Sequence, residues 1–282
     1  MTVKVRNLSA VVVWIAGCMA TADLAANDAP LAAPDSSTSP RLAKYEVGII
    51  FMHGRLGVPD YLSPLARALR DEGYLIETPV TSWSKNRSFD STVDESMAEI
   101  DLIADGLRAQ GARRLIVGGH SLGGAAALRY GATRANVDGL ILIAASWNPA
   151  SPSWQRIVDE SIGRAREAIN AGRDRDTATY QYVTNDGKSA PVVAHARGYF
   201  DFNRPDSSMA LATNARKFGH TVPVIWLSAS NDSATARQVA SDAFRSLPAH
   251  AQSRHETLAA SHNGAITAAA TSVSAWLDIL RQ

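Results

Sequence analysis

A serine between two glycines stands in the most informative stretch of the chain. Residues 119–123 read GHSLG and fit the pattern G-x-S-x-G. In that pattern the serine lies on a sharp, strained turn between a strand and a helix, and neighbouring side chains must be absent to make room. Ser121 is therefore a candidate nucleophile, and Gly119 and Gly123 leave the space that the turn needs.

The flanking residues support this interpretation, because a short motif alone occurs by chance in many chains. Leu115-Ile116-Val117 is a β-branched, apolar run typical of a buried strand, and the small residues from Gly123 to Ala127 begin a helix. The alternative is a glycine-rich turn that binds phosphate or nothing. Neither GxGxxG nor GxxxxGK[ST] occurs here, which disfavours a phosphate site.

Composition limits the classes of function. With 282 residues, 46% hydrophobic and 20% charged, the chain is long enough for one large α/β domain with an insertion. The net charge of +1 gives no basic surplus for nucleic acid. Cys18 is the only cysteine, and the seven histidines show no metal-ligand spacing, so neither a metal nor another cofactor is expected.

Strands and helices alternate along the chain after Tyr45. Helices are expected to begin at Ser63 and Ser91, at residue 236 and near Ile266, and apolar runs predict strands at 47–52, 74–77, 115–117, 137–144, 222–227 and 256–259. Such alternation implies right-handed crossovers and a mostly parallel, doubly wound sheet covered on both faces. The predicted fold class is therefore α/β.

Residues 147–220 interrupt this alternation. They contain an amphipathic helix between Trp154 and Gly172, followed by a polar stretch with scattered aromatic residues, and no strong parallel-strand run. We interpret this interval as a helical cap inserted over the carboxyl edge of the sheet. The alternative is a peripheral helical excursion far from the site.

The chain resembles the α/β-hydrolase superfamily over about residues 45–282. Three segments carry the resemblance: HGRLG at 53–57, SWSKNR at 82–87 and GGHSLGG at 118–124. They are most similar to a branch of exported, mostly uncharacterised bacterial members. The resemblance implies an α/β-hydrolase fold and nucleophilic catalysis, and it says much less about the substrate.

The family's chain order of serine, acid and histidine indicates His262 as the base. A serine hydroxyl is too weak an acid to attack unassisted, so a base must accept its proton. His262 follows the last expected strand and precedes the last helix. His255 is the main competitor but starts that strand too early, and His120 is expected to be held facing away from the nucleophile.

The acid of the resembling family follows a late strand, and Asp232 lies five residues beyond Leu227 at that place. Some relatives carry the acid after the preceding strand, but residues 145–148 read ASWN, without a carboxylate. The competing role for Asp232 is to cap the following helix.

Backbone N–H groups are expected to stabilise the negative charge that develops on the carbonyl oxygen. Leu122 would contribute one donor from the turn, and Arg55, directly after His53-Gly54, the other. Trp83 and Trp147 follow strand ends on the catalytic side and are candidate pocket residues, with further aromatic candidates at Tyr199, Phe200 and Phe202. Each of these aromatic side chains could equally be core packing.

The first 22 residues resemble an export signal, with Lys4 and Arg6 before an apolar run. Ile15-Ala16-Gly17-Cys18 resembles a bacterial lipobox, so Cys18 is a lipidation candidate that would anchor the protein to a membrane. Ordinary cleavage after Ala22 or Ala26, giving a free periplasmic or secreted protein, is the alternative. Residues 23–44 are expected to form a flexible tether.

Together these features predict an exported serine hydrolase that cleaves small carboxylic esters through an acyl-enzyme on Ser121. A thioesterase, lipase or peptidase would use the same residues, and a non-catalytic ligand-binding relative is the alternative of another class. The natural substrate and the oligomeric state are not indicated by the sequence.

Overall fold

A computed structural model describes residues 41–282 of the chain. The expected export signal over residues 1–22 and its lipidation candidate Cys18 lie outside the described residues and stay predictions. The expected tether of 23–44 lies mostly outside as well. Its last residues do not hang free, because Leu42 exchanges hydrogen bonds with Arg281, and Lys44 pairs with Glu72. The ordered domain therefore begins before Tyr45.

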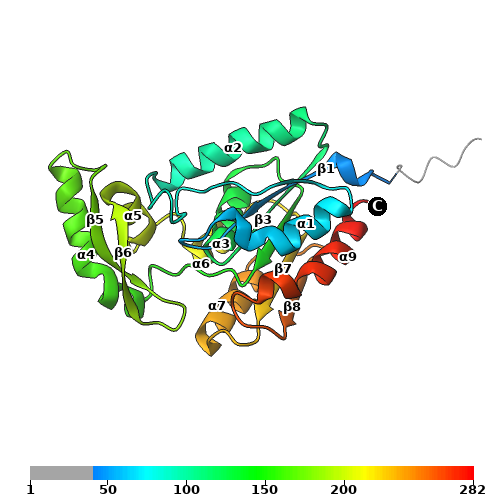
Figure 1. Ribbon diagram of the computed structural model, residues 1–282. Helices are drawn as coiled ribbons and strands as arrows, with labels where there is room; N and C mark the ends of the chain where they lie inside the picture. The colour runs from blue at the N-terminus through cyan, green and yellow to red at the C-terminus, as the bar shows by residue number, and fades with distance from the viewer. Residues whose placement is uncertain (1–40) are drawn as a thin grey trace, which may run out of the picture. The chain divides into compact units, whose positions relative to one another are not determined.

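Six parallel strands form the central sheet, in the spatial order β2-β1-β3-β4-β7-β8 (Figure 1). Their bounds are β1 Val47–Met52, β2 Leu75–Glu77, β3 Arg114–His120, β4 Gly139–Ile143, β7 Val224–Ala229 and β8 Arg254–Leu258. The chain starts in the interior of the sheet, adds one strand outward and then returns past β1. This α/β architecture is the predicted one.

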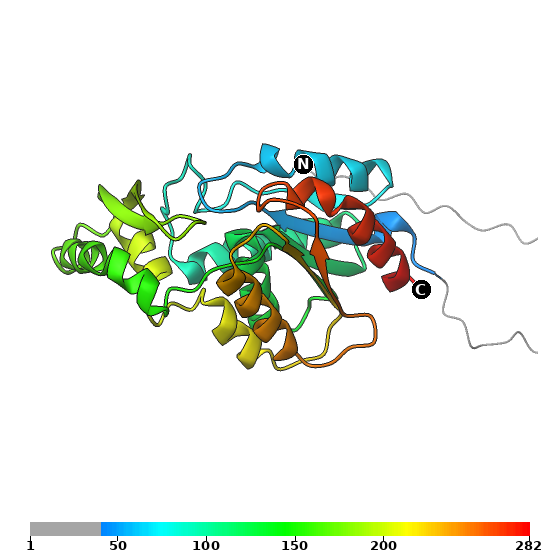
Figure 2. The same ribbon diagram turned by 90° about the horizontal axis from the view of Figure 1, so that it is seen from below.

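Helices cover both faces of the sheet (Figure 2). One face carries α1 (Ser63–Asp71), α8 (Ala265–Ala268) and α9 (Ala270–Leu280), and the other carries α2 (Val93–Ala109), α3 (Leu122–Thr133), α6 (Leu211–Lys217) and α7 (Ala234–Arg245). Short 3-10 turns at Lys44–Glu46 and Pro59–Leu62 precede β1 and α1. None of the helices in this described part is both long and apolar enough to cross a membrane.

Burial on both faces explains the apolar strand sequences. In β1, Ile49 and Phe51 pack towards α1 and α9, whereas Ile50 and Met52 pack towards α2 and α3. All six residues of this strand are buried. Strands buried on both sides read as continuous apolar runs, which is why these segments were recognisable from the sequence.

Helix boundaries differ slightly from the expectation. The cap of α2 is Thr92 rather than Ser91, because the Thr92 hydroxyl accepts from the Glu95 N–H while the Glu95 carboxylate accepts from the Thr92 N–H. This reciprocal pair satisfies two donors at once, which Ser91 could not do in that register. The last helical segment is divided at Ala269 into α8 and α9.

The segment between β4 and β7 is more than the helical cap that the sequence suggested. It contains α4 (Pro152–Asn170), an antiparallel hairpin of β5 (Thr177–Val183) and β6 (Ser189–His195), and α5 (Ala196–Asn203). These elements stand beyond the end of the sheet in Figure 1. The polar outer faces of β5 and β6 concealed them, since neither strand is an apolar run. Helix α6, also within 147–220, packs against α3 and α7 instead.

Gly198 is the point where α5 touches the loop before α2. A Cβ atom at this position would overlap the carbonyl group of Phe89 and crowd the Ser91 carbonyl oxygen. Both obstacles are backbone atoms, which cannot rotate away as a side chain can. The approach of the inserted elements to the main domain therefore requires glycine here.

We predict that Gly198→Ala lowers the free energy of unfolding by at least about 2 kcal/mol, because the added methyl group forces two backbones apart. Gly163→Ala, in α4 of the same insertion, is the matched control. Nothing lies within 4 Å of a Cβ at Gly163, so that substitution should raise stability by about 0.5–1 kcal/mol. Urea unfolding of both variants measures the change in the free energy of unfolding. Equal changes would contradict the requirement for glycine where α5 contacts the loop before α2.

Candidate active site

Ser121 lies at the turn between β3 and α3. Its backbone has φ 56° and ψ −118°, a conformation that costs a non-glycine residue about 1–3 kcal/mol and persists only where the surroundings impose it. The Ser121 N–H donates to the Ile143 carbonyl at 2.9 Å, which ties the turn to the neighbouring strand β4. The strained turn expected from the sequence is present.

The glycines beside Ser121 leave no room for any side chain. A Cβ atom at Gly119 would overlap the backbone of Gly123, and one at Gly123 would overlap the Met52 carbonyl at the end of β1. The first turn of α3 is therefore pressed against β1. This close packing holds the serine at the carboxyl edge of the sheet.

His262 and Asp232 meet beside this turn. The Nδ1 atom of His262 lies 2.8 Å from Asp232 Oδ1, and both side chains are mostly buried, at 13% and 14% exposure. Because a carboxylate only accepts hydrogen bonds, Nδ1 carries the proton, and the lone pair of Nε2 is free to act as a base. The structure thus brings together the two residues that the sequence placed thirty positions apart.

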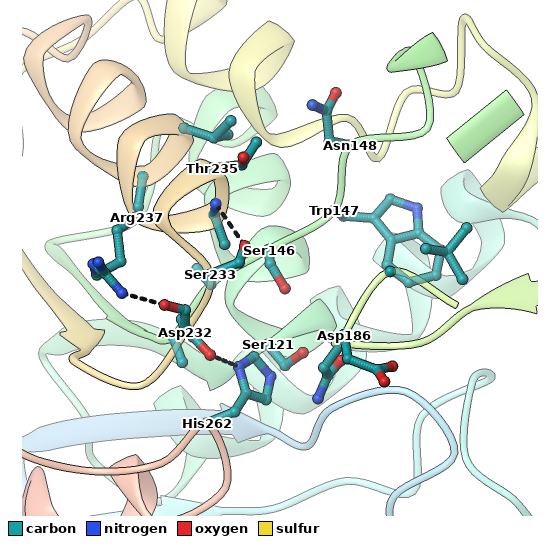
Figure 3. Close-up of a pocket in the computed structure, with 18 of the residues that line it drawn as sticks. Ser121, Ser146, Trp147, Asn148, Asp186, Asp232, Ser233, Thr235, Arg237 and His262 are labelled. Carbon is teal, nitrogen blue, oxygen red and sulfur yellow. Dashed lines mark hydrogen bonds and ion pairs between the residues drawn. The ribbon is translucent and has the colours of Figure 1, made fainter. Parts of the chain in front are cut away.

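The other ring nitrogen of His262, Nε2, has no hydrogen-bond partner among the described residues. This atom is buried. Figure 3 shows the Ser121 side chain beside the imidazole ring. The bond through which a proton would pass is not formed in this structure, a common state of catalytic hydrogen bonds before substrate binds.

Asp232 does not cap the following helix, which removes the competing role. The cap of α7 is Ser233, whose hydroxyl accepts from the Ala236 N–H at 3.1 Å. Arg237, one turn into α7, donates to the backbone carbonyls of Ser230 and Asp232. Figure 3 shows the bond to Asp232. Arg237 therefore fixes the loop that carries the acid. Sequence reasoning missed it, although an arginine five residues after an expected acid was the available signal.

His120 does not face away from the site as expected. Its ring centre lies 4.8 Å from that of His262, and its Nε2–H donates to the His262 backbone carbonyl at 2.8 Å. Burial, with a smaller effect from the neighbouring His262, lowers the pKa of His120 to about 4, so this ring is neutral at physiological pH. His120 therefore holds the loop that carries His262.

His255, the competing base, has a structural position. Its Nε2 atom lies 2.9 Å from the Ser228 hydroxyl, and its ring packs between Trp226 and Phe244. It lines neither of the cavities beside Ser121. It is therefore not placed to accept a proton from Ser121.

The loop after β1 lies directly against the serine. A Cβ atom at Gly54 would sit 3.2 Å from the Ser121 Cβ. The hydrogen bonds of the described residues leave the backbone N–H groups of Arg55 and Leu122 without a partner. Both expected oxyanion donors therefore flank the nucleophile with their hydrogen-bonding capacity unused.

Of the two candidate pocket tryptophans, only Trp147 lines the cavity that contains Ser121. The Trp147 indole N–H donates to the Phe202 carbonyl. Trp83 does not line this cavity. It is fully buried, and its indole N–H donates to the His53 carbonyl at 2.8 Å. Trp83 thus braces the loop that carries Arg55. The candidates Tyr199, Phe200 and Phe202 pack in the interior and do not line the cavity.

The cavity over Ser121 has a volume of about 330 Å³. The main domain forms one wall, and the turn of the β5–β6 hairpin, residues 184–187, forms another. Figure 3 shows Asp186 of this turn among the residues that line the cavity together with Ser121. The insertion is therefore part of the site rather than a peripheral excursion.

We predict that His120 makes stability depend on pH. The folded protein keeps this imidazole neutral down to about pH 4, whereas the unfolded chain binds a proton below about pH 6.5. The unfolded state therefore holds more protons in this window, and stability falls as pH falls, by up to about 3 kcal/mol. In His120→Gln, urea unfolding at pH 4.5 and 7.5 should show a smaller loss than in the wild type; identical losses would contradict this origin.

The fold is shared with several proteins of known structure. One is from work on the metagenome-derived lipolytic enzymes LipS and LipT (TM-score 0.58, 16% identity, 84% of this chain and 94% of that one). Others are MenH from S. aureus (0.56, 14%, 84% and 95%) and the siderophore hydrolase EstB from Aspergillus fumigatus (0.56, 16%, 86% and 93%). Identities this low establish the fold alone. No curated protein matches the chain significantly.

A family match covers the part of the chain that contains the three expected catalytic residues. Residues 83–264 match the family described as serine aminopeptidase, S33, a span that includes Ser121, Asp232 and His262. With the parallel sheet, the strained turn and the solved relatives, this match places the chain in a defined group. The protein belongs to the serine aminopeptidase S33 family of the α/β-hydrolase superfamily.

Proposed function

We propose that this hydrolase cleaves carboxylic esters through an acyl-enzyme on Ser121, with His262 as base and Asp232 as the orienting acid. The observation that carries the proposal is the 2.8 Å contact between His262 Nδ1 and Asp232, which leaves Nε2 free beside a serine in a strained turn. Asp232 thereby holds the imidazole in the tautomer that a base requires.

In the first half of the reaction the Ser121 hydroxyl attacks the ester carbonyl as Nε2 of His262 accepts its proton. Asp232 stabilises the imidazolium that forms. The backbone N–H groups of Leu122 and Arg55 bind the negatively charged oxygen of the tetrahedral intermediate, a contribution of about 3 kcal/mol per donor. His262 then returns the proton to the leaving alcohol, and the acyl group stays on Ser121.

In the second half a water molecule takes the place of the alcohol. His262 accepts a proton from the water as it attacks the acyl-enzyme, and the same two N–H groups hold the second tetrahedral intermediate. Collapse of that intermediate returns the proton to Ser121 and releases the carboxylic acid.

The charges of the cavity favour an ester over an amino-terminal peptide. An aminopeptidase must bind the ammonium group of its substrate, which calls for a free carboxylate. Of the two carboxylates that line this cavity, Asp232 is bonded to His262, and Asp186 forms a solvent-exposed pair with Lys188 at 2.8 Å. The guanidinium groups of Arg55 and Arg237 line the same cavity and would repel an ammonium group.

We predict that Ser121→Ala lowers turnover of p-nitrophenyl butyrate by at least about 10³-fold and abolishes labelling by a fluorophosphonate probe. Ser146→Ala removes another hydroxyl from the same cavity and should still be labelled. Labelling of the Ser121 variant, or no labelling of the wild type, would exclude the serine mechanism. Faster cleavage of alanine p-nitroanilide than of the ester would instead favour a peptidase.

We predict that Arg237→Met lowers kcat for the same ester by about tenfold, because the loop of Asp232 loses the donor that holds its carbonyls. Arg245→Met is the control, since Arg245 lies on the same helix but pairs only with the exposed side chains of Ser241 and Asp242. Steady-state kinetics separate kcat from KM. Equal kcat values for the two variants would exclude a positioning role for Arg237.

A further inference from the structure

Two cavities meet at the nucleophile. The first, of about 330 Å³, extends from Ser121 along Trp147 and the start of α7. The second, of about 520 Å³, extends along the loop after β1. Both are lined by Ser121 and His262, and also by Arg55 and Asn185. An ester bound across Ser121 would thus place both its acyl and its alcohol parts close to Arg55.

The side chain of Arg55 is mostly buried yet carries no balancing charge. Within residues 41–282 no carboxylate lies within 4.0 Å of its guanidinium group. One nitrogen, Nη1, donates to the Val183 carbonyl at 2.7 Å, and Nε and Nη2 make no hydrogen bond. Neither Nε nor Nη2 is among the fully buried polar atoms that lack a partner, so both are accessible to solvent. Their N–H groups are therefore available at the junction of the cavities.

Aromatic rings hold this guanidinium group in place. Its central carbon lies 4.0 Å from the centre of the Tyr182 ring and 5.8 Å from that of Trp147. Contact with a ring face leaves the edge of the guanidinium plane free, and the N–H donors point outward from that edge. Burial lowers the pKa of Arg55 to about 10, so the group stays charged at neutral pH.

The other charged groups of the first cavity do not neutralise Arg55. Asp232 is bonded to His262, and Asp186 is paired with Lys188. Arg237 uses its Nη1 atom for the backbone carbonyls of the acid loop. A charged, mostly buried arginine with free donors beside the nucleophile is the arrangement that binds an anionic group in two-pronged fashion.

We propose that the substrate is an anionic ester whose carboxylate, near the scissile bond, is bound by the guanidinium group of Arg55. This inference rests on the proposed ester hydrolysis and names its substrate class. The carboxylate accepts hydrogen bonds from Nε and Nη2, and the ester carbonyl lies over Ser121. The free-energy cost of removing the Arg55 guanidinium group from water is then offset by the carboxylate of the bound substrate. In the free enzyme no carboxylate offsets this cost.

Two matched pairs of esters test the proposal. For an anion on the acyl side, monoethyl glutarate is compared with ethyl glutaramate, in which a neutral amide of the same size replaces the carboxylate. For an anion on the alcohol side, 4-acetoxybutanoate is compared with 4-acetoxybutanamide. We predict that kcat/KM of the wild type favours the anionic member of at least one pair by about 10- to 100-fold, the effect of one charged hydrogen-bonded contact.

Arg55→Gln should bring that ratio close to one, whatever it does to the absolute rates, because the neutral side chain no longer distinguishes the members of a pair. Arg237→Met is the matched control, a second arginine of the first cavity, and should retain the ratio while lowering both rates. An unchanged ratio in Arg55→Gln would mean that Arg55 only ties the loop to Tyr182 and Val183, and would overturn the proposal. Loss of the preference in Arg237→Met would overturn it too.

A measurement on the wild type covers the case in which Arg55→Gln does not fold. Free glutarate should inhibit turnover of the neutral ester more strongly than glutaramide does, and added salt should weaken this inhibition. Equal inhibition by the two would overturn the proposal. Hydrolysis of the neutral esters by the wild type, lost in Ser121→Ala, supports ester hydrolysis independently, so failure of the anion preference is distinguishable from failure of the proposed function.

Discussion

The site depends on the close approach of α3 to the end of β1. Gly119 and Gly123 lie so near the opposing backbone that a single methyl group would overlap it, and this packing imposes the strained conformation of Ser121. The strained conformation persists because the parallel pairing of β3 with β1 and β4 over-determines the turn. The backbone of Ser121 is thus held in place by packing before any substrate binds.

Backbone contacts extend from this turn to the rest of the site. His120 bonds to the carbonyl of His262, and Arg237 bonds to the carbonyls around Asp232. Trp83 bonds to the carbonyl of His53, beside the loop of Arg55. Three loops are thus each held by a hydrogen bond from a side chain to the loop backbone. Such supporting contacts keep reacting groups within the narrow geometry that proton transfer requires.

The insertion contributes in a different way. Its hairpin places Tyr182 and Val183 against the guanidinium group of Arg55, and its turn covers the cavity beside Ser121. Arg55 therefore belongs to the loop that lies against Ser121, while its side chain contacts the hairpin that lines the cavity. In our proposal this one residue links the oxyanion site, through its backbone, with recognition of an anionic substrate, through its side chain.

Local pattern alone determined much of this protein. Buried parallel strands read as apolar runs, and the turn around Ser121 is a contiguous motif, so the α/β class and the strained turn could be predicted. The family's chain order pointed to Asp232 and His262, which lie in contact in the structure. Only the tertiary structure decided which side chains face the cavity. Trp83 and Trp147 both follow the end of an expected strand. In the structure, however, Trp83 supports the loop of Arg55 and Trp147 lines the cavity. The contacts of His120 with His262 and of the Arg55 side chain with Tyr182 and Val183 were likewise hidden, because folding brings these partners from distant parts of the chain.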